Sequence, residues 1–145
     1  MEIGTKVHVN YLSAGRRVYS TGSEQDLVNH YGTVTRLLTH GYCTIEVADE
    51  VTGDILTGSF CGHELDNFGS DWPKYRIGDT MRICNISERE KRQYPVGWYN
   101  AMDEHIGQVA RIERHGTEHN CYKLEGIGWI WHDSSLEPVY EFIGY

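Results

Sequence analysis

Hydrophobic and polar residues alternate in several short segments of the chain, and these segments come in pairs. A glycine precedes the alternation in IGTKVHV (residues 3–9) and again in IGDTMRI (residues 77–83). A period of two is typical of half-buried β-strands. The same pattern predicts further strands, paired between the two halves, at residues 32–38 and 107–113, 42–48 and 121–126, and 55–60 and 128–132.

The pairing of segments indicates an internal duplication. HYGTVTRLLTHG (residues 30–41) and HIGQVARIERHG (residues 105–116) carry the same residue at six of twelve positions. Similar endings, HELDNF and HDSSLEPV, predict a short turn after each fourth strand. The predicted organisation is one repeat at 1–68, a linker at 69–74 broken by Pro73, a second repeat at 75–139, and a C-terminal tail or strand at 140–145.

Long polar excursions separate the first and second strands of each repeat, and short helical turns are expected within them. Ser87 and Glu90 have the spacing of a capping box, and Asn100 is expected to cap a turn that Gly107 ends. Leu27 and Met102 occupy matching places and are expected to fill one end of their repeats with an apolar side chain.

These features predict a mainly all-β fold made of two small, strongly bent antiparallel barrels with glycines at the corners. The pattern Gly-x-x-Val-x-Val, a loop, Gly-x-Val and a short final turn resembles SH3-like barrels of the KOW, Tudor-like and Mib-Herc2-like kinds. The second repeat, from YPVGWYNAMDEHIGQVARI to YKLEGIGWIWHDSSLEPV, is similar to a pattern in small bacteriophage proteins. The resemblance covers 75–139 well and 3–68 loosely, and it implies binding rather than a particular chemistry.

Composition narrows the classes of function. The chain has 145 residues, and 21 acids against 13 bases give a net charge of −8, which weighs against binding to a phosphate backbone. The N-terminus lacks the pattern of a signal peptide, and no apolar run is long enough for a membrane span. The widely spaced cysteines are therefore expected to be buried thiols; they are Cys43, Cys61, Cys84 and Cys121. A cytoplasmic protein without membrane contact is expected.

An aromatic group in the second repeat is the best candidate for a ligand or partner site. It comprises Tyr94, Trp98, Tyr99, Met102, Trp129 and Trp131, with the adjacent His132. Because Trp129 and Trp131 are two apart on a predicted strand, both are expected on one face, with Ile130 on the other. Two interpretations remain open: the rings cover the end of the barrel, or they form an aromatic groove for a side chain, a base or a cation.

Metal and catalytic sites are not predicted. CGH (residues 61–63) and the group His115, His119 and Cys121 lack the convergent spacing of zinc ligands, and solvent-exposed turn histidines with buried cysteines explain them better. HDSS (residues 132–135) is more typical of a turn than of a catalytic triad. No cofactor motif is present, so we expect no catalytic residues, no cofactor and no enzyme activity.

The predicted function is therefore that of a non-enzymatic, phage-type protein that binds and modulates a host protein, such as a defence or transcription component, in the host cytoplasm. It would use the aromatic loop of the second repeat and a groove between repeats. The first alternative is nucleic-acid or nucleotide binding, through rings that stack on bases and through local basic residues: Arg16, Arg17, Arg76, Arg82, Arg89, Lys91 and Arg92. The second is an enzyme of another type. The apolar VYEFIGY (residues 139–145) could form a last strand or an open edge for a partner chain.

Overall fold

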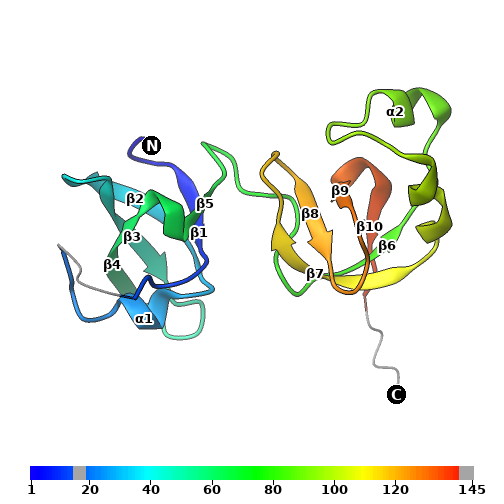
Figure 1. Ribbon diagram of the computed structural model, residues 1–145. Helices are drawn as coiled ribbons and strands as arrows, with labels where there is room; N and C mark the ends of the chain where they lie inside the picture. The colour runs from blue at the N-terminus through cyan, green and yellow to red at the C-terminus, as the bar shows by residue number, and fades with distance from the viewer. Residues whose placement is uncertain (15–18, 141–145) are drawn as a thin grey trace, which may run out of the picture. The chain divides into compact units, whose positions relative to one another are not determined.

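The computed structural model describes residues 1–14 and 19–140. The chain divides into two compact units, Met1–Trp72 and Pro73–Tyr145, here called unit 1 and unit 2 (Figure 1). Each unit contains one five-stranded antiparallel sheet and only short helical segments. The prediction of a mainly β, two-part fold is thus confirmed.

Unit 1 has the strand order β4-β3-β2-β1-β5. The long excursion between its first two strands ends in a single helical turn, as expected. Its elements are β1 (Lys6–Val9), α1 (Glu24–Leu27), β2 (Tyr31–Leu37), β3 (Tyr42–Ala48), β4 (Ile55–Cys61), the 3₁₀ turn η1 (Gly62–Glu64) and β5 (Leu65–Asn67).

Unit 2 has the same topology. Its order β9-β8-β7-β6-β10 corresponds strand by strand to that of unit 1, starting in each unit from the fourth strand. Its longer excursion carries two helical segments, α2 and η2. The elements are β6 (Thr80–Ile83), α2 (Glu88–Arg92), η2 (Asn100–His105), β7 (Val109–His115), β8 (Cys121–Leu124), β9 (Ile130–His132), the 3₁₀ turn η3 (Asp133–Ser135) and β10 (Leu136–Pro138).

The last turn of each unit explains how its sheet bends. The strands β4 and β5 lie at opposite edges of the unit 1 sheet, yet only the three residues of η1 separate them in sequence. The turn η3 joins β9 and β10 in the same way. Because three residues span only about 10 Å at most, each sheet must curl until its edges approach each other. The name SH3-like barrel stays a prediction.

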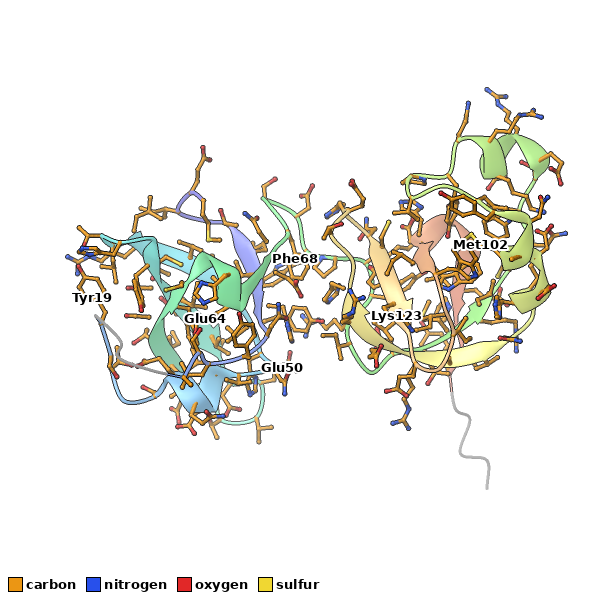
Figure 2. The ribbon with its side chains drawn as sticks, in the orientation of Figure 1. Tyr19, Glu50, Glu64, Phe68, Met102 and Lys123 are labelled. Carbon is orange, nitrogen blue, oxygen red and sulfur yellow. The ribbon has the colours of Figure 1, made fainter. Side chains whose placement is uncertain are left out.

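Each unit encloses its own hydrophobic core. Leu27 and Met102 are both buried there, which confirms the expected apolar plugs; Met102 is labelled in Figure 2. The core of unit 1 comprises Val7, Val9, Leu27, Val34, Cys43, Ile45, Val47, Phe60 and Leu65. That of unit 2 comprises Met81, Ile83, Tyr94, Met102, Ile112, Tyr122, Leu124, Ile127, Trp131 and Leu136.

The two second strands are equivalent in a different register from the one the sequence suggests. A bulge follows Val34 in β2 and follows Ile112 in β7, and both side chains are fully buried. Equivalent residues are therefore 78 positions apart, whereas the matched segments starting at His30 and His105 are 75 apart. The alternation predicted within residues 107–113 is present, with Ala110 and Ile112 as the more buried residues. The alignment of Val34 with Val109 was wrong, because Val109 is 47% exposed.

Of the two residues predicted to cap helical segments in unit 2, one does so. The backbone N–H of Glu90 donates to Ser87 Oγ at 3.1 Å, so Ser87 is the N-cap of α2. The Glu90 carboxylate accepts from the Ser87 hydroxyl at 3.1 Å, which is not the reciprocal bond of a capping box. The segment η2 begins at Asn100 instead of after it, and Tyr99 is its N-cap residue, so Asn100 does not cap the turn.

Residues on either side of Pro73 are attached to different units. The ring of Trp72 lies 6.3 Å from the ring of Tyr31 in β2, edge to face. The backbone N–H of Tyr75 donates to the hydroxyl of Tyr122 in β8 at 2.9 Å. Within the predicted linker 69–74, Trp72 thus packs as part of unit 1.

Candidate functional site

The structure divides the predicted site residues of unit 2 into an inner and an outer set. Trp131, Met102 and Tyr94 are buried in the core. Trp98 and His132 are half-buried, whereas Tyr99 and Trp129 are 58% and 39% exposed. The interpretation that the rings cover the end of the core therefore holds for the inner set, whereas the aromatic groove stays a prediction for the outer set.

Trp129 and Trp131 do not share a face, and this prediction was wrong. The strand β9 begins at Ile130, so Trp129 precedes it, with a left-handed backbone φ of 75°. A residue in that conformation interrupts the alternation of a strand. As a result Trp131 points into the core, while Trp129 stays at the surface.

The exposed pair Tyr99 and Trp129, here called the ledge, forms a stacked aromatic surface. Their ring centroids are 5.1 Å apart and the planes are inclined by 23°. A Cβ placed on Gly97, whose φ is 81°, would lie 3.5–3.7 Å from the Tyr99 ring, so the Gly97 backbone lies close beside that ring. The backbone N–H of Tyr99 donates to the Met102 sulfur at 3.2 Å, which ties the ledge to the core.

Trp98, the residue before Tyr99, is anchored to the core of unit 2. Its ring packs edge to face on Trp131 at 5.6 Å, and its indole N–H donates to Asp103 Oδ1 at 3.0 Å. Lys91 Nζ lies 5.4 Å over the Trp98 ring and 3.0 Å from the same carboxylate. The hydrogen bond to Lys91, then the one from Trp98, lowers the pKa of Asp103, so this carboxyl is ionised at neutral pH.

A buried hydroxyl network holds the turn after β9. Tyr94 Oη lies 2.5 Å from Ser135 Oγ, accepts from the His132 N–H, and donates to the His132 carbonyl at 3.2 Å. Burial raises the pKa of Tyr94 to about 12, although the Ser135 and His132 hydrogen bonds act in the opposite direction. Tyr94 is therefore a neutral structural residue that satisfies the backbone at the edge of β9.

The HDSS segment forms a capped turn with no catalytic geometry. His132 Nδ1 accepts from the Ser134 N–H at 3.2 Å and lies 2.9 Å from Ser134 Oγ and 3.0 Å from Asp133 Oδ1. In a Ser-His-Asp relay the hydroxyl and the carboxylate are at opposite ring nitrogens. Here both are at Nδ1, so His132 is positioned as the N-cap of η3.

The described part of unit 1 has no equivalent of the ledge, because Glu24 lies close to the position that corresponds to Trp129. Phe60 and Trp131 are equivalent core rings, so Gly58 corresponds to Trp129. A Cβ on Gly58 would lie 3.0 Å from Glu24 Oε2, and Glu24 is buried. Burial by itself raises the pKa of this carboxyl, but hydrogen bonds from Thr21 and Ser20 outweigh it and the pKa is lowered.

Sequence reasoning missed a second aromatic surface, on unit 1. Trp72 is 42% exposed and contacts Tyr31, whose ring also stacks near Phe68 at 6.1 Å. Lys6 Nζ lies 5.2 Å over the Trp72 ring. The position of Trp72 beside Pro73 suggested a linker, and no local pattern links it to β1 and β2.

The described histidines and cysteines do not cluster in the way that metal ligands do. Across residues 1–14 and 19–140, no group of three or more potential ligands could hold a metal ion. All four cysteines are free; Cys43 and Cys121 are buried as expected, whereas Cys61 and Cys84 are only partly buried. His115 is 5% exposed and packs on Tyr122, which contradicts its assignment as a solvent-exposed turn histidine.

Two of the predicted basic residues are engaged in ion pairs. Arg82 lies 2.9 Å from Glu137, and Lys91 contacts Asp103. Arg16 and Arg17 lie outside the described residues, as does most of the 139–145 segment. None of the described helices is long and apolar enough to cross a membrane.

No protein-family model matches the sequence, and no curated protein matches it significantly.

Proposed function

We propose that the protein is a non-enzymatic binding protein and that the ledge contacts a protein partner. The observation that carries this proposal is Trp129, an exposed tryptophan in a left-handed backbone conformation. For a non-glycine residue this conformation costs about 1–2 kcal/mol, and such strain gathers at binding sites. Folding alone would favour glycine in this conformation. The equivalent Gly58 of unit 1 lies within the regular strand β4 and does not adopt it.

Protein interfaces are rich in tryptophan and tyrosine, because each ring buries a large area at little cost in conformational entropy. The ledge offers two such rings side by side. Tyr99 is fixed by Gly97 and by its N–H bond to Met102, so the surface is formed before a partner arrives. A preformed surface loses less entropy on binding.

Nucleic acid is a less suitable partner for this surface. The nearby Lys91 is only 13% exposed and contacts Glu88 and Asp103, so it offers little charge to a phosphate. The two ledge rings stack on each other and leave no slot between them for a base. The net charge of −8 opposes the electrostatic attraction on which such binding depends.

The proposed partner is a host protein, such as a defence or transcription component, met in the cytoplasm of a bacterial host. The resemblance of unit 2 to small bacteriophage proteins supports this part of the proposal. The aromatic ledge supports only the mode of contact, which is one protein surface against another.

The test is capture of a partner with a matched pair of variants. Tagged wild type, Trp129→Ala and Trp72→Ala are purified from a bacterial lysate with nuclease, and the eluates are compared by native mass spectrometry. Trp72 is the control because it is an exposed tryptophan of similar accessibility on the other unit.

We expect one host protein to co-elute with wild type and with Trp72→Ala, and to be lost from Trp129→Ala. Circular dichroism establishes that the variants remain folded. Equal retention by Trp129→Ala, or a co-eluting nucleotide in place of a protein, would overturn the proposal.

A further inference from the structure

The exposed tryptophans of this chain differ in what covers their rings. Trp72 has Lys6 Nζ at 5.2 Å from its centroid, and the half-buried Trp98 has Lys91 Nζ at 5.4 Å. Trp131 is fully buried in the core. Among the described residues no lysine or arginine lies over Trp129, so its electron-rich face is the one left without a cation.

Three charged residues near the ledge in the sequence bear on which ligand could occupy the free face of Trp129: Lys91, Asp103 and Glu125. Asp103 stays ionised at neutral pH, and the cation next to it, Lys91, is already shared between that carboxylate and Trp98. Glu125 is exposed in the turn that leads from β8 to Trp129. In the sequence, an acidic residue thus lies four positions from each ledge ring, Asp103 after Tyr99 and Glu125 before Trp129, in a unit with eleven acids and nine bases.

A cation above an indole is attracted by the ring quadrupole, by about 0.5–1 kcal/mol at an exposed site and by about 2 kcal/mol when desolvated. A carboxylate close to the bound cation adds to this attraction. Arginine fits best, because its planar guanidinium stacks on a ring and is more weakly hydrated than an ammonium group.

We infer that the partner completes the ledge with a cationic side chain, an arginine of a basic protein segment placed over Trp129. The inference rests on the proposed function and specifies its partner chemistry. In the complex, Trp129 would then have the environment that Trp72 and Trp98 have within the chain itself.

The test uses peptides that differ only in charge. The full-length ¹⁵N-labelled protein is titrated with an acetylated peptide of alternating glycine and arginine, with the same peptide carrying citrulline, and with its glutamate counterpart. Citrulline has nearly the shape of arginine but no charge. The readout is the indole N–H signal of Trp129, assigned by its disappearance from Trp129→Phe.

We expect the arginine peptide to shift the Trp129 indole signal and to bind at least about 5-fold more tightly than the citrulline peptide, the ratio that about 1 kcal/mol produces. Trp129→Leu keeps an apolar side chain but should abolish this preference, measured in this variant by the backbone amide signals around Tyr99. Trp72→Leu is the control and should retain it.

Equal binding of the arginine and citrulline peptides, or no shift of the Trp129 signal with either, would overturn the inference. A shift with oligothymidylate but not with the peptides would also overturn it, in favour of base stacking. These outcomes are separable from failure of the proposed function. A host protein whose capture requires Trp129 would uphold that function even if the cation had no role.

Discussion

The backbone of Trp129 gives a direct test of strain at a single residue. Replacement by Ala or Gly removes the stack with Tyr99 equally, but only Gly adopts the φ of 75° without cost. We therefore expect Trp129→Gly to be more stable than Trp129→Ala by about 1 kcal/mol in urea unfolding. At Ile130, in regular strand, Ala should be more stable than Gly, and the same order at both positions would contradict the strained conformation.

His8 should make the stability of unit 1 depend on pH. It is 2% exposed, and burial lowers its pKa below 6.5, only partly offset by the hydrogen bond to Asn10 and by the charge of Asp66. The unfolded chain therefore takes up a proton at a higher pH than the folded chain does. His30 acts in the same direction as burial, and the adjacent Tyr31 ring is neutral.

The contribution of His8 to stability is thus fully present above pH 6.5 and is lost as the pH falls through the lower folded-state pKa. Urea unfolding between pH 7.5 and 5, compared with His8→Gln, measures it. We expect wild type to lose more stability than the variant over this range. A smaller loss in wild type would show that protonated His8 is stabilised in the fold.

Residue-level outcomes separate what sequence can predict from what it cannot. The aromatic residues of unit 2 could be singled out from the sequence, and their role as a binding site stays a prediction. The division between Trp129 and Trp131 was not predictable, since period-two alternation assumes extended backbone at both residues. A left-handed conformation at tryptophan has no sequence signal of its own, unlike one at glycine.

The second strands offer a matched test at the level of elements, because Gly32 in β2 and Ala110 in β7 occupy the same position. Gly32 pairs with Val7 of β1, and Ala110 pairs with Met81 of β6. A Cβ on Gly32 would lie 2.7 Å from Ile45 Cγ2 and 2.8 Å from the Glu46 carbonyl oxygen. Backbone at that distance cannot move aside as a side chain can.

We expect Gly32→Ala to destabilise the fold by about 1–3 kcal/mol through overpacking. The reverse change, Ala110→Gly, should cost only about 0.5–1 kcal/mol, from backbone entropy. The free energies of unfolding of the two variants check this. A Gly32→Ala variant as stable as wild type would mean that β2 and β3 can separate to admit a methyl group.

Alternation of hydrophobic and polar residues was enough to locate most strands. It was not enough to align the second strand of one unit with that of the other. The strand β3 occupies residues 42–48, as predicted, and β9 is shorter than its predicted segment because Trp129 leaves the strand. The shared His and Gly residues of the second strands imposed a 75-residue offset. The real offset depends on where Val34 and Ile112 meet the core, a long-range property set by the bulges.

For the whole molecule, the duplicated topology holds two units of different surface chemistry. Residues 1–72 contain ten acids and four bases, whereas residues 73–145 contain eleven acids and nine bases. The excess negative charge is thus concentrated on the unit that lacks the ledge. The two units share one topology and have separate cores, while unit 2 carries Trp129 where unit 1 has Gly58.

Separate cores predict that each unit folds when expressed by itself. Fragments 1–72 and 73–145 each contain a complete five-stranded sheet and its core, so no strand loses its neighbours when the chain is divided after Trp72. We expect each fragment to show a cooperative thermal transition and dispersed amide signals.

Trp131→Ala should cost the second fragment about 3–5 kcal/mol, enough to unfold most domains of this size, because the fully buried ring leaves a large cavity. Trp129→Ala removes a ring of the same kind from the surface and should leave that fragment folded. If both variants unfolded it, the ledge would be part of the core of unit 2 and could not be free to contact a partner.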